Sequence, residues 1–251
     1  YYISKYYLYR FTYKMDVLFC SIVIPFRDEE NNLEVLLPSL ANVISSLNDS
    51  IEVILVNDFS QDNSQKTCND NLNLFQNVQL INLERPSGQS GAFCEAFKLA
   101  RGVFILRMDA DLQDNPNDIP YFIQKFNEGY DLVVGLRECR KHRKLFRIAS
   151  IIYDLIILIL FDTPLHSNSG SFIGFKSALV KNISWKKNDH RYLPLIAYRR
   201  GAKKIGEIIV SHSYRIHGKS KYKPFKKLIF GIPEVLLFLR RLYYGHYDKK
   251  N

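Results

Sequence analysis

The sequence predicts an α/β fold built on a doubly wound, mostly parallel sheet. Two observations support this prediction. Short apolar runs of strand length alternate with amphipathic segments of helix length through residues 16–136, and polar side chains follow most of the runs. This alternation is typical of parallel strands that are joined by helices. The chain has 251 residues, which is enough for one such domain with an appendage.

The predicted elements follow one another at short intervals. We expect strands over 21–25, 52–56, 78–81, 102–108 and 131–135, and helices over 31–47, 62–74, 92–100 and 117–127. A late strand is expected over 203–213. The segment 224–244 carries apolar residues at helical spacing beside lysine and arginine, which predicts an amphipathic helix broken near Pro233. The apolar run 148–160 is too short for a membrane span, which needs about 20 residues.

Polar or turn-forming residues stand where the predicted strands end: Pro25, Asp58, Glu84–Arg85, Asp109 and Gly135. Open sheets of this type bind ligands outside the carboxyl ends of their strands. We therefore expect these positions to converge on one edge of the sheet.

The stretch 107–114 is the strongest candidate for chemistry. Asp109 and Asp111 alternate just past an apolar strand, so their carboxylates should face a cleft. Carboxylates in such a place suit a hard cation, Mg2+ or Mn2+, that is shared with a diphosphate. A polar strand-to-helix loop in which Asn115-Pro116 caps the next helix also fits the pattern, and these residues alone leave both interpretations open.

Charge is unevenly divided along the chain. The net charge is +10, but residues 16–136 hold 7 Lys and Arg against 18 Asp and Glu, whereas residues 137–251 hold 25 against 7. A basic C-terminal half indicates an anionic partner. The sequence lacks an aromatic RNA-binding motif, a helix-turn-helix and a zinc finger pattern, so we expect an anionic membrane surface and no nucleic acid. The four cysteines form no Cys-x-x-Cys pair, which is typical of a reduced cytosolic protein.

Five motifs in order then give a family resemblance. They are Ser21-Ile-Val-Ile-Pro-Phe-Arg-Asp-Glu-Glu30, Ile54-Leu-Val-Asn-Asp-Phe-Ser-Gln-Asp62, Arg85-Pro-Ser-Gly-Gln-Ser-Gly91, Asp109-Ala-Asp-Leu-Gln-Asp114 and Gly218-Lys-Ser-Lys-Tyr222. Together they resemble family 2 glycosyltransferases with the GT-A fold, a Rossmann-like type of doubly wound sheet. Within that family the chain resembles the polyprenyl-phosphate branch, which includes dolichyl-phosphate mannose synthase and bactoprenol glucosyltransferases.

The resemblance implies a donor site. Pro25, Phe26 and Glu29 would line the pocket for the nucleotide base, and Asp58 would bind the same nucleoside. Asp109, Asp111 and Gln113 match the family's metal triad, in which Asp109 also contacts the nucleotide-sugar and Asp109 and Asp111 are the catalytic carboxylates. Asp114 is then expected to be a helix-start residue before Pro116. An alternative for Glu29 and Glu30 is a helix N-terminus, which favours acidic side chains.

The resemblance also implies an acceptor site made of cations. Arg137, Arg147, Arg215 and Lys221 fall where the lipid-phosphate ligands of the family are expected, and Arg191 lies in a segment expected to support the acceptor loop. Guanidinium groups match phosphate oxygens in shape and charge. A phosphate acceptor is already an anion at neutral pH, so it needs alignment and charge neutralisation more than a general base.

Three departures from the family pattern stand out. Phe59 replaces the glycine of the usual Asp-Gly-Ser, and Ser167-Asn168 replaces an aspartate that is common there. Two C-terminal transmembrane helices found in many relatives are missing from this sequence, so an amphipathic tail or a membrane-protein partner is expected to provide attachment.

Taken together, the sequence predicts three regions: residues 1–15, an N-terminal arm or a mis-assigned start; 16–222, the catalytic domain; and 223–251, a membrane-associating segment. The expected protein is peripheral, on the cytoplasmic side of a membrane. The expected reaction is inverting transfer of a sugar from a UDP- or GDP-sugar to polyprenyl or dolichyl phosphate. The alternatives are a glycan or lipopolysaccharide hydroxyl acceptor, and a non-catalytic nucleotide-sugar-binding or scaffolding protein.

Overall fold

A computed structural model describes residues 18–137, 171–211 and 224–248, with side chains from 233 onward in the last range. Its strands are β1 (Cys20–Phe26), β2 (Ile51–Asn57), β3 (Val78–Asn82), β4 (Phe104–Arg107), β5 (Leu132–Arg137), β6 (Ile173–Lys176) and β7 (Ile205–Val210). Its α-helices are α1 (Glu30–Ser45), α2 (Ser64–Asn71), α3 (Gly88–Leu99), α4 (Ile119–Asn127), α6 (Leu193–Arg199) and α7 (Pro224–Tyr243). Short 3-10 helices are η1 (Leu72–Leu74), η2 (Pro116–Asp118), η3 (Ser177–Leu179) and η4 (Asp189–Tyr192).

The strands form one seven-stranded mixed sheet in the order β3-β2-β1-β4-β6-β5-β7. Strands β1, β2, β3 and β4 are mutually parallel, and β7 runs parallel to β5. Among the described strands, β6 alone is reversed, because it pairs antiparallel with both β4 and β5. The carboxyl ends of β1, β2, β3, β4 and β5 therefore share one edge, and the predicted α/β fold with a mostly parallel sheet is confirmed.

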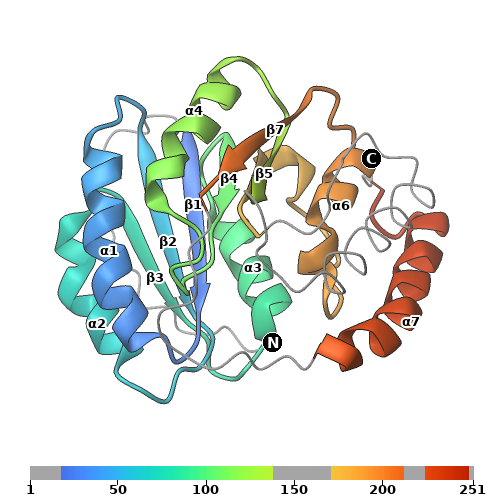
Figure 1. Ribbon diagram of the computed structural model, residues 1–251, viewed down its shortest axis with the longest axis horizontal. Coiled ribbons are helices and arrows are strands. Elements are labelled where there is room, and N and C mark those ends of the chain that lie inside the picture. Colours follow the sequence, from blue (N-terminus) through green and yellow to red (C-terminus); the bar gives the residue numbers. More distant parts are fainter. Residues whose placement is uncertain (1–17, 138–170, 212–223, 249–251) are drawn as a thin grey trace, which may run out of the picture.

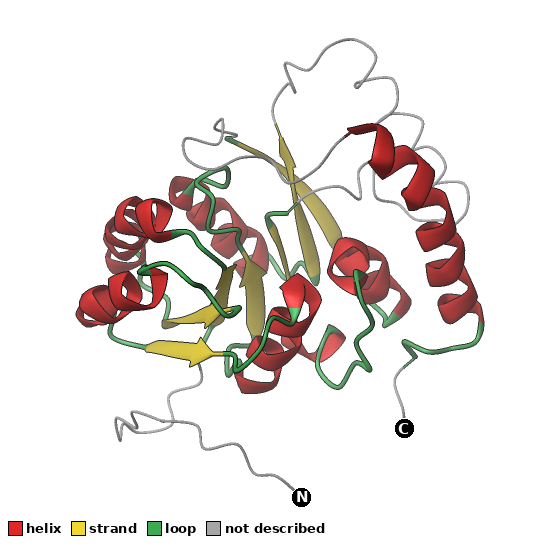
Figure 2. Ribbon diagram, turned by 90° about the horizontal axis from the view of Figure 1, so that it is seen from below, coloured by secondary structure: helices red, strands yellow, loops and turns green. Residues whose placement is uncertain are grey.

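Helices cover both faces of the sheet (Figures 1 and 2). On one face, apolar residues of α1, α2 and α4 pack against the side chains that alternate strand residues direct toward them, such as Ile22, Ile24 and Leu106. On the other face, α3, α6 and α7 pack against Val23, Ile105 and their neighbours. Both faces of the central strands are thus buried, which explains why these strands are continuous apolar runs in the sequence.

The sequence prediction missed β6 and placed the ends of some helices differently. The helix α3 begins at Gly88, four residues before the predicted start, because the Gly88-Gln-Ser-Gly91 segment is its first turn. Pro233 lies inside α7 without ending it, so the predicted break there is wrong. Pro233 is exposed, and the turn that follows it is fixed by buried Val235 and Phe238, which offset the backbone hydrogen bond that a proline removes.

The C-terminal helix α7 lies at one end of the molecule beyond α6 (Figure 1). Its residues Val235 and Phe238 belong to the same buried cluster as α3 and α6. Among the described helices, none has the length and apolar character needed to cross a membrane.

Candidate active site

The loops that follow β1 and β2 are joined by hydrogen bonds between carboxylates and backbone N–H groups. The Asp28 N–H donates to Ser60 Oγ at 3.0 Å, and Asp28 Oδ1 accepts from the Gln61 N–H at 2.7 Å. Beside this pair, the Glu29 N–H donates to Ser64 Oγ at 2.8 Å. Glu30 completes the set, because its N–H donates to Asp62 and its carboxylate accepts from Asn63. We call these loops, residues 28–30 and 58–64, together with 87–88, the rim.

Two rim residues hold left-handed backbone conformations. Asp28 has a φ of 57° and Phe59 a φ of 61°. Such angles cost little for glycine and more for a residue with a bulky side chain. The Phe59 ring is 39% exposed, so burial of the ring contributes little toward offsetting that cost. The glycine of the usual motif would suit the same backbone conformation. The substitution by Phe59 therefore changes the side chain but not the path of the loop.

Asp58 joins the rim to the start of α3. Its Oδ1 accepts from the Ser87 N–H at 2.6 Å and its Oδ2 accepts from the Gly88 N–H at 2.9 Å. Gly88 has a φ of 66°, a conformation that favours glycine and directs successive N–H groups to one carboxylate. Asp58 is only 6% exposed, and both of its carboxylate oxygens bind the backbone of this turn.

The residues expected to line the base pocket have different environments. The Phe26 side chain packs in the core against the α1 face, and the Phe26 carbonyl accepts from the Asp58 N–H at 2.9 Å. Pro25 is also buried within β1. Glu29 precedes the first residue of α1 and its carboxylate accepts from Asn32 Nδ2, which fits the helix N-terminus interpretation. Of this group, Glu29 lies on the rim, whereas the side chains of Pro25 and Phe26 are buried.

The loop that carries Asp109, Asp111 and Gln113 leaves the carboxyl end of β4, as predicted from the sequence. Asp111 Oδ1 accepts from the Gln113 N–H at 3.3 Å, and Leu112 between them has a φ of 62°. Asp111 is 7% exposed. This bond places Asp111 and Gln113 in one tight turn, two residues after Asp109. Throughout the described ranges, no three His, Cys, Asp or Glu side chains gather closely enough to hold a metal ion by themselves.

Asp114 is buried behind this turn and joins it to β5 and β6. Its Oδ2 accepts from the Asp109 N–H at 3.1 Å, and its carboxylate accepts from Ser171 Oγ at 3.0 Å. Arg137, at the end of β5, donates to the same Ser171 and lies 3.7 Å from Asp114. Burial, and then the negative charge of Asp109, raise the pKa of Asp114 to about 7 against the opposing effect of Arg137.

The interpretation of Asp114 as a helix-start residue is therefore wrong. Asn115 performs that role, since its Oδ1 accepts from the Asn117 N–H at 3.0 Å at the start of η2. Arg137, predicted to bind the acceptor phosphate, contacts the loop of Asp109 through Ser171 and Asp114. Arg147, Arg215 and Lys221, the other predicted phosphate ligands, lie outside the described residues.

Arg107 is a buried cation beside the loop 108–114, which we call the metal loop after the three metal ligands predicted in it. It is the last residue of β4 and is 5% exposed. Its Nη1 donates to the His190 carbonyl at 2.9 Å, its Nη2 lies 3.4 Å from Asp109 Oδ1, and its guanidinium carbon lies 4.7 Å from the centre of the Phe93 ring. Among the residues that the structure describes, none accepts a hydrogen bond from Arg107 Nε. The guanidinium is thus fixed by a carbonyl and a ring, and its charge faces Asp109.

His190 is also buried and links η4 to α3. Its Nδ1 lies 2.8 Å from Ser90 Oγ, in the first turn of α3. Burial, together with the positive charges of Arg107 and Arg191, lowers the pKa of His190 to about 3. The ring is therefore neutral at physiological pH.

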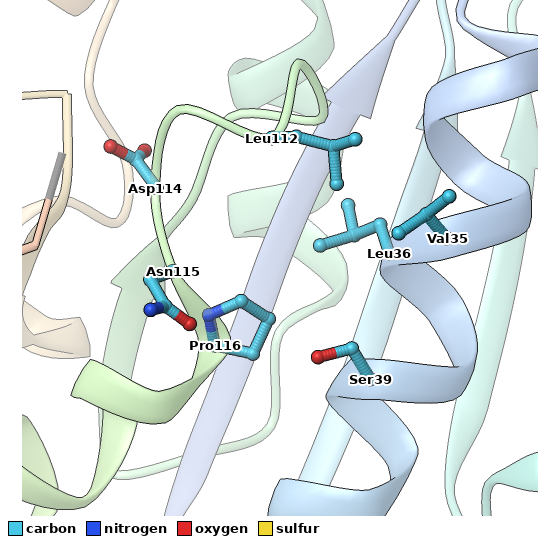
Figure 3. A pocket seen from close by; sticks show the side chains of 7 residues that line it. All are labelled: Val35, Leu36, Ser39, Leu112, Asp114, Asn115 and Pro116. Carbon is cyan, nitrogen blue, oxygen red and sulfur yellow. The ribbon is translucent and has the colours of Figure 1, made fainter. Parts of the chain in front are cut away.

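The opposite side of the metal loop borders a small apolar cavity. Its volume is about 200 Å³. Figure 3 shows Leu112 and Pro116 facing Val35, Leu36 and Ser39 of α1 across it, while the Asp114 carboxylate points away. The loop thus has an apolar side that rests on α1 and a polar side that carries its carboxylates.

A match to a known protein family identifies the family of this chain. Residues 21–184 match the family model "Glycosyl transferase family 2". The chain belongs to glycosyl transferase family 2. The match includes the rim, the start of α3, the metal loop and β6, which are the parts of this family 2 chain that surround the carboxyl edge of its sheet.

The names of two curated relatives of this family 2 chain state that they act on polyprenyl phosphates. One is the dodecaprenyl-phosphate galacturonate synthase of Rhizobium johnstonii, with 31% identity over 88% of this chain and 67% of that protein. Another is the undecaprenyl-phosphate 4-deoxy-4-formamido-L-arabinose transferase of Proteus mirabilis, with 33% identity over 83% of this chain and 64% of that protein. The chain thus spans about two thirds of the length of these relatives.

Solved structures confirm the GT-A type of fold. Glucosyl-3-phosphoglycerate synthase from Mycobacterium tuberculosis, in complex with Mn2+, uridine-diphosphate and glucosyl-3-phosphoglycerate, superposes with a TM-score of 0.68. The alignment covers 88% of this chain and 80% of the synthase, at 14% sequence identity. The likeness is one of fold.

Three residues of the site had no role assigned by the sequence analysis: Arg107, Ser171 and Ser90. Arg107 carried a visible signal, because it is the single charged residue inside the apolar run of β4. Ser171 and Ser90 carried none, because their partners Asp114 and His190 are 57 and 100 residues away in the chain.

Proposed function

We propose that this family 2 chain transfers one sugar, with inversion, from a UDP- or GDP-sugar to a polyprenyl or dolichyl phosphate at the cytoplasmic face of a membrane. The observation that carries the proposal is the juxtaposition of Asp109 and Arg137 through Asp114 and Ser171. It joins a carboxylate loop suited to a metal diphosphate and an arginine suited to an acceptor phosphate. The names of the relatives support the choice of a lipid phosphate.

The donor side would be held by oxygen ligands. Asp109, Asp111 and Gln113 offer carboxylate and amide oxygens, which fit Mg2+ or Mn2+, and phosphate oxygens of the nucleotide would complete a site with few protein ligands. When bound, the cation would stabilise charge that develops on the diphosphate. Arg107 supports the same side by neutralising part of the charge of Asp109 at 3.4 Å.

The acceptor side needs cations rather than a base. Arg137 contacts Ser171 and Asp114 through Nη2, and a guanidinium carries five N–H donors in all, so one arginine can bind both the protein and a phosphate. A phosphate oxygen attacks the anomeric carbon without first losing a proton at neutral pH, so the residues on this side align the nucleophile and reduce repulsion.

The outer face of α7 supports peripheral attachment to a membrane. Leu236 and Leu237 are each 57% exposed, and Tyr243 and Tyr244 are 86% and 73% exposed. We call these four residues the outer stripe. Exposed leucine and tyrosine on one helix of a basic half-chain are suited to the interface of an anionic bilayer.

Incubation with a panel of UDP- and GDP-sugars, Mg2+ or Mn2+, and a polyprenyl phosphate tests the reaction. We expect a lipid-linked sugar with one donor, and at least a 100-fold loss of rate in Asp111→Asn, because removal of one charged ligand from such a site costs about that much. Asp70→Asn, an exposed residue of α2, is the matched control. Absence of product with every donor, from protein that binds nucleotide, contradicts the proposal, and product on a sugar hydroxyl alone favours the alternative acceptor.

Sedimentation with phosphatidylglycerol vesicles tests the attachment. The double variant Leu236→Ser, Leu237→Ser should bind about tenfold less, because each leucine removed from lipid loses apolar contact. Leu74→Ser, an exposed leucine of η1, should leave binding unchanged. Equal binding by both variants would reject the outer stripe as the attachment surface.

A further inference from the structure

Three consecutive residues of η4 contact different parts of the molecule. Asp189 and Arg191 bind α7 and the residues that follow it, whereas His190 between them binds α3 and β4. The 3-10 helix η4 therefore contacts α7 on one side and Arg107, next to the metal loop, on the other.

The contacts on the α7 side hold η4 against α7 and the residues that follow it. We call the residues that make these contacts the latch: Asp189, Arg191, Tyr192, Glu234, Phe238, Arg241 and Tyr247. Arg241 Nη1 lies 2.7 Å from Asp189 Oδ1, and the Tyr247 hydroxyl donates to the same oxygen at 2.8 Å. Arg191 Nη1 lies 3.0 Å from Glu234 Oε2. Tyr192 stacks on Phe238 with their ring centres 4.0 Å apart. Asp189 is fully buried, so its charge depends on these partners and on the Lys186 N–H.

The contacts on the other side lead to Asp109. Within the described residues, Arg107 donates to two acceptors, Asp109 Oδ1 and the His190 carbonyl, and the carbonyl lies 2.9 Å from Arg107 Nη1. A displacement of η4 therefore moves the acceptor that holds the guanidinium. Because Arg107 is 5% exposed, water cannot readily replace that carbonyl.

We propose that α7 positions the metal loop. The latch keeps η4 in place, the His190 carbonyl of η4 binds Arg107, and Arg107 binds Asp109. The inference rests on the proposed function, because it takes the loop of Asp109 as the place where the metal nucleotide binds. It makes Arg241, Glu234 and Arg107 positioning residues. In the described part of the chain, the contacts of Arg241 and Tyr247 lead to Asp189 of η4, so we expect their effect on nucleotide binding to pass through η4.

The chain offers a matched pair of variants. Arg240 and Arg241 are adjacent on α7, but Arg240 is exposed and Arg241 binds Asp189. Arg240→Gln and Arg241→Gln remove the same charge from the same helix, so only the second opens the latch. Arg241→Lys keeps a positive charge within reach of Asp189 and should restore most of the effect.

The measurement is titration of UDP and of GDP into each protein in the presence of Mn2+, without lipid. We expect Arg241→Gln to bind the nucleotide five- to tenfold more weakly than wild type, Arg241→Lys to bind within about threefold, and Arg240→Gln within twofold. A latch that only adds stability predicts a lower melting temperature for Arg241→Gln with an unchanged dissociation constant, and that result overturns the inference.

Hydrogen exchange separates failure of the inference from failure of the proposed function. Wild type that binds neither nucleotide contradicts the proposed function. The latch is then judged by the backbone amides of 107–113, which should exchange faster in Arg241→Gln and not in Arg240→Gln; unchanged exchange rejects it. Should Arg241→Gln not fold, Glu234→Gln removes the second carboxylate of the latch, which pairs with Arg191, and the same comparison with Arg240→Gln applies.

Discussion

The rim and the latch both depend on carboxylates, but they give them different partners. In the rim, Asp28, Asp58 and Glu30 accept hydrogen bonds from backbone N–H groups of neighbouring loops. In the latch, Asp189 and Glu234 bind the side chains of Arg241 and Arg191. Backbone donors are fixed by the fold, whereas arginine forks sit on long side chains that can exchange partners.

The comparison teaches that the two sides of the site are organised for different tasks. The rim is held in place by the sheet and the helix starts. The latch can be released without breaking a strand, which suits a helix with an exposed outer stripe. Because the rim is bonded to the backbone of the sheet and the latch to side chains of α7, substitutions in the latch should open α7 locally. Substitutions in the rim should lower the stability of the whole domain.

The largest expected effect is at the centre of the latch. Asp189→Asn removes a buried charge that has an arginine, a tyrosine and a backbone N–H as partners. We expect about 3 kcal/mol less protection of α7 against opening, because breaking one partner of a buried pair costs that order. Hydrogen exchange of residues 233–248 measures it. Equal loss of protection in β1 and β2 would show that the latch and the sheet form one cooperative unit.

The next effect is in the rim. Asp58→Asn places an amide NH2 against one of two backbone N–H donors, so either Ser87 or Gly88 loses its acceptor. We expect a loss of about 2 kcal/mol in the free energy of unfolding, measured by urea denaturation, because a buried donor left unpaired costs about 1–3 kcal/mol. Asp70→Asn is the control. A change confined to α3, with the global value intact, would remove the distinction between rim and latch.

A comparable effect depends on pH and lies where the two sides meet. His190 has a folded pKa of about 3, and Ser90 of α3, Arg107 of β4 and Arg191 of η4 surround it. Its unfolded pKa is near 6.5, so the unfolded chain binds a proton first and stability is lost as pH falls below 6.5. At pH 5 this linkage amounts to about 2 kcal/mol. His190→Gln should remove this contribution, so its unfolding free energy should rise relative to that of wild type by about 2 kcal/mol between pH 7 and 5. A difference that stays constant over this range assigns the pH dependence to other groups.

The smallest effect is at the outer end of the latch side. Arg199 and Asp248 form an ion pair at 2.9 Å whose side chains are 52% and 47% exposed. Solvent screens such a pair, so Asp248→Asn should change the unfolding free energy by less than about 0.5 kcal/mol. Thermal melting at low and high salt checks this. A loss as large as that of Asp189→Asn would mean that exposure does not separate the two pairs.

The sequence predicted the first part of the sheet well and the site less completely. Strands β1, β2 and β4 are apolar runs with polar exits, so both the strands and the sheet edge that Asp58 and Asp109 follow could be predicted. Strand β6 is four residues long and contains Gly174, and so short a run has no readable period. Asp114 was misread because its partner Ser171 follows 57 residues later, and no local pattern reports such a distance.

The reversed strand β6 also constrains the order in which the chain can assemble. It lies between β4 and β5 in space but follows both in the chain, so β5 and β7 cannot join the other strands until residue 176 has been made. Strands β1 to β4 need no such delay, because each pairs with a neighbour already present. A chain emerging from the ribosome should therefore form strands β1 to β4 first and the latch last.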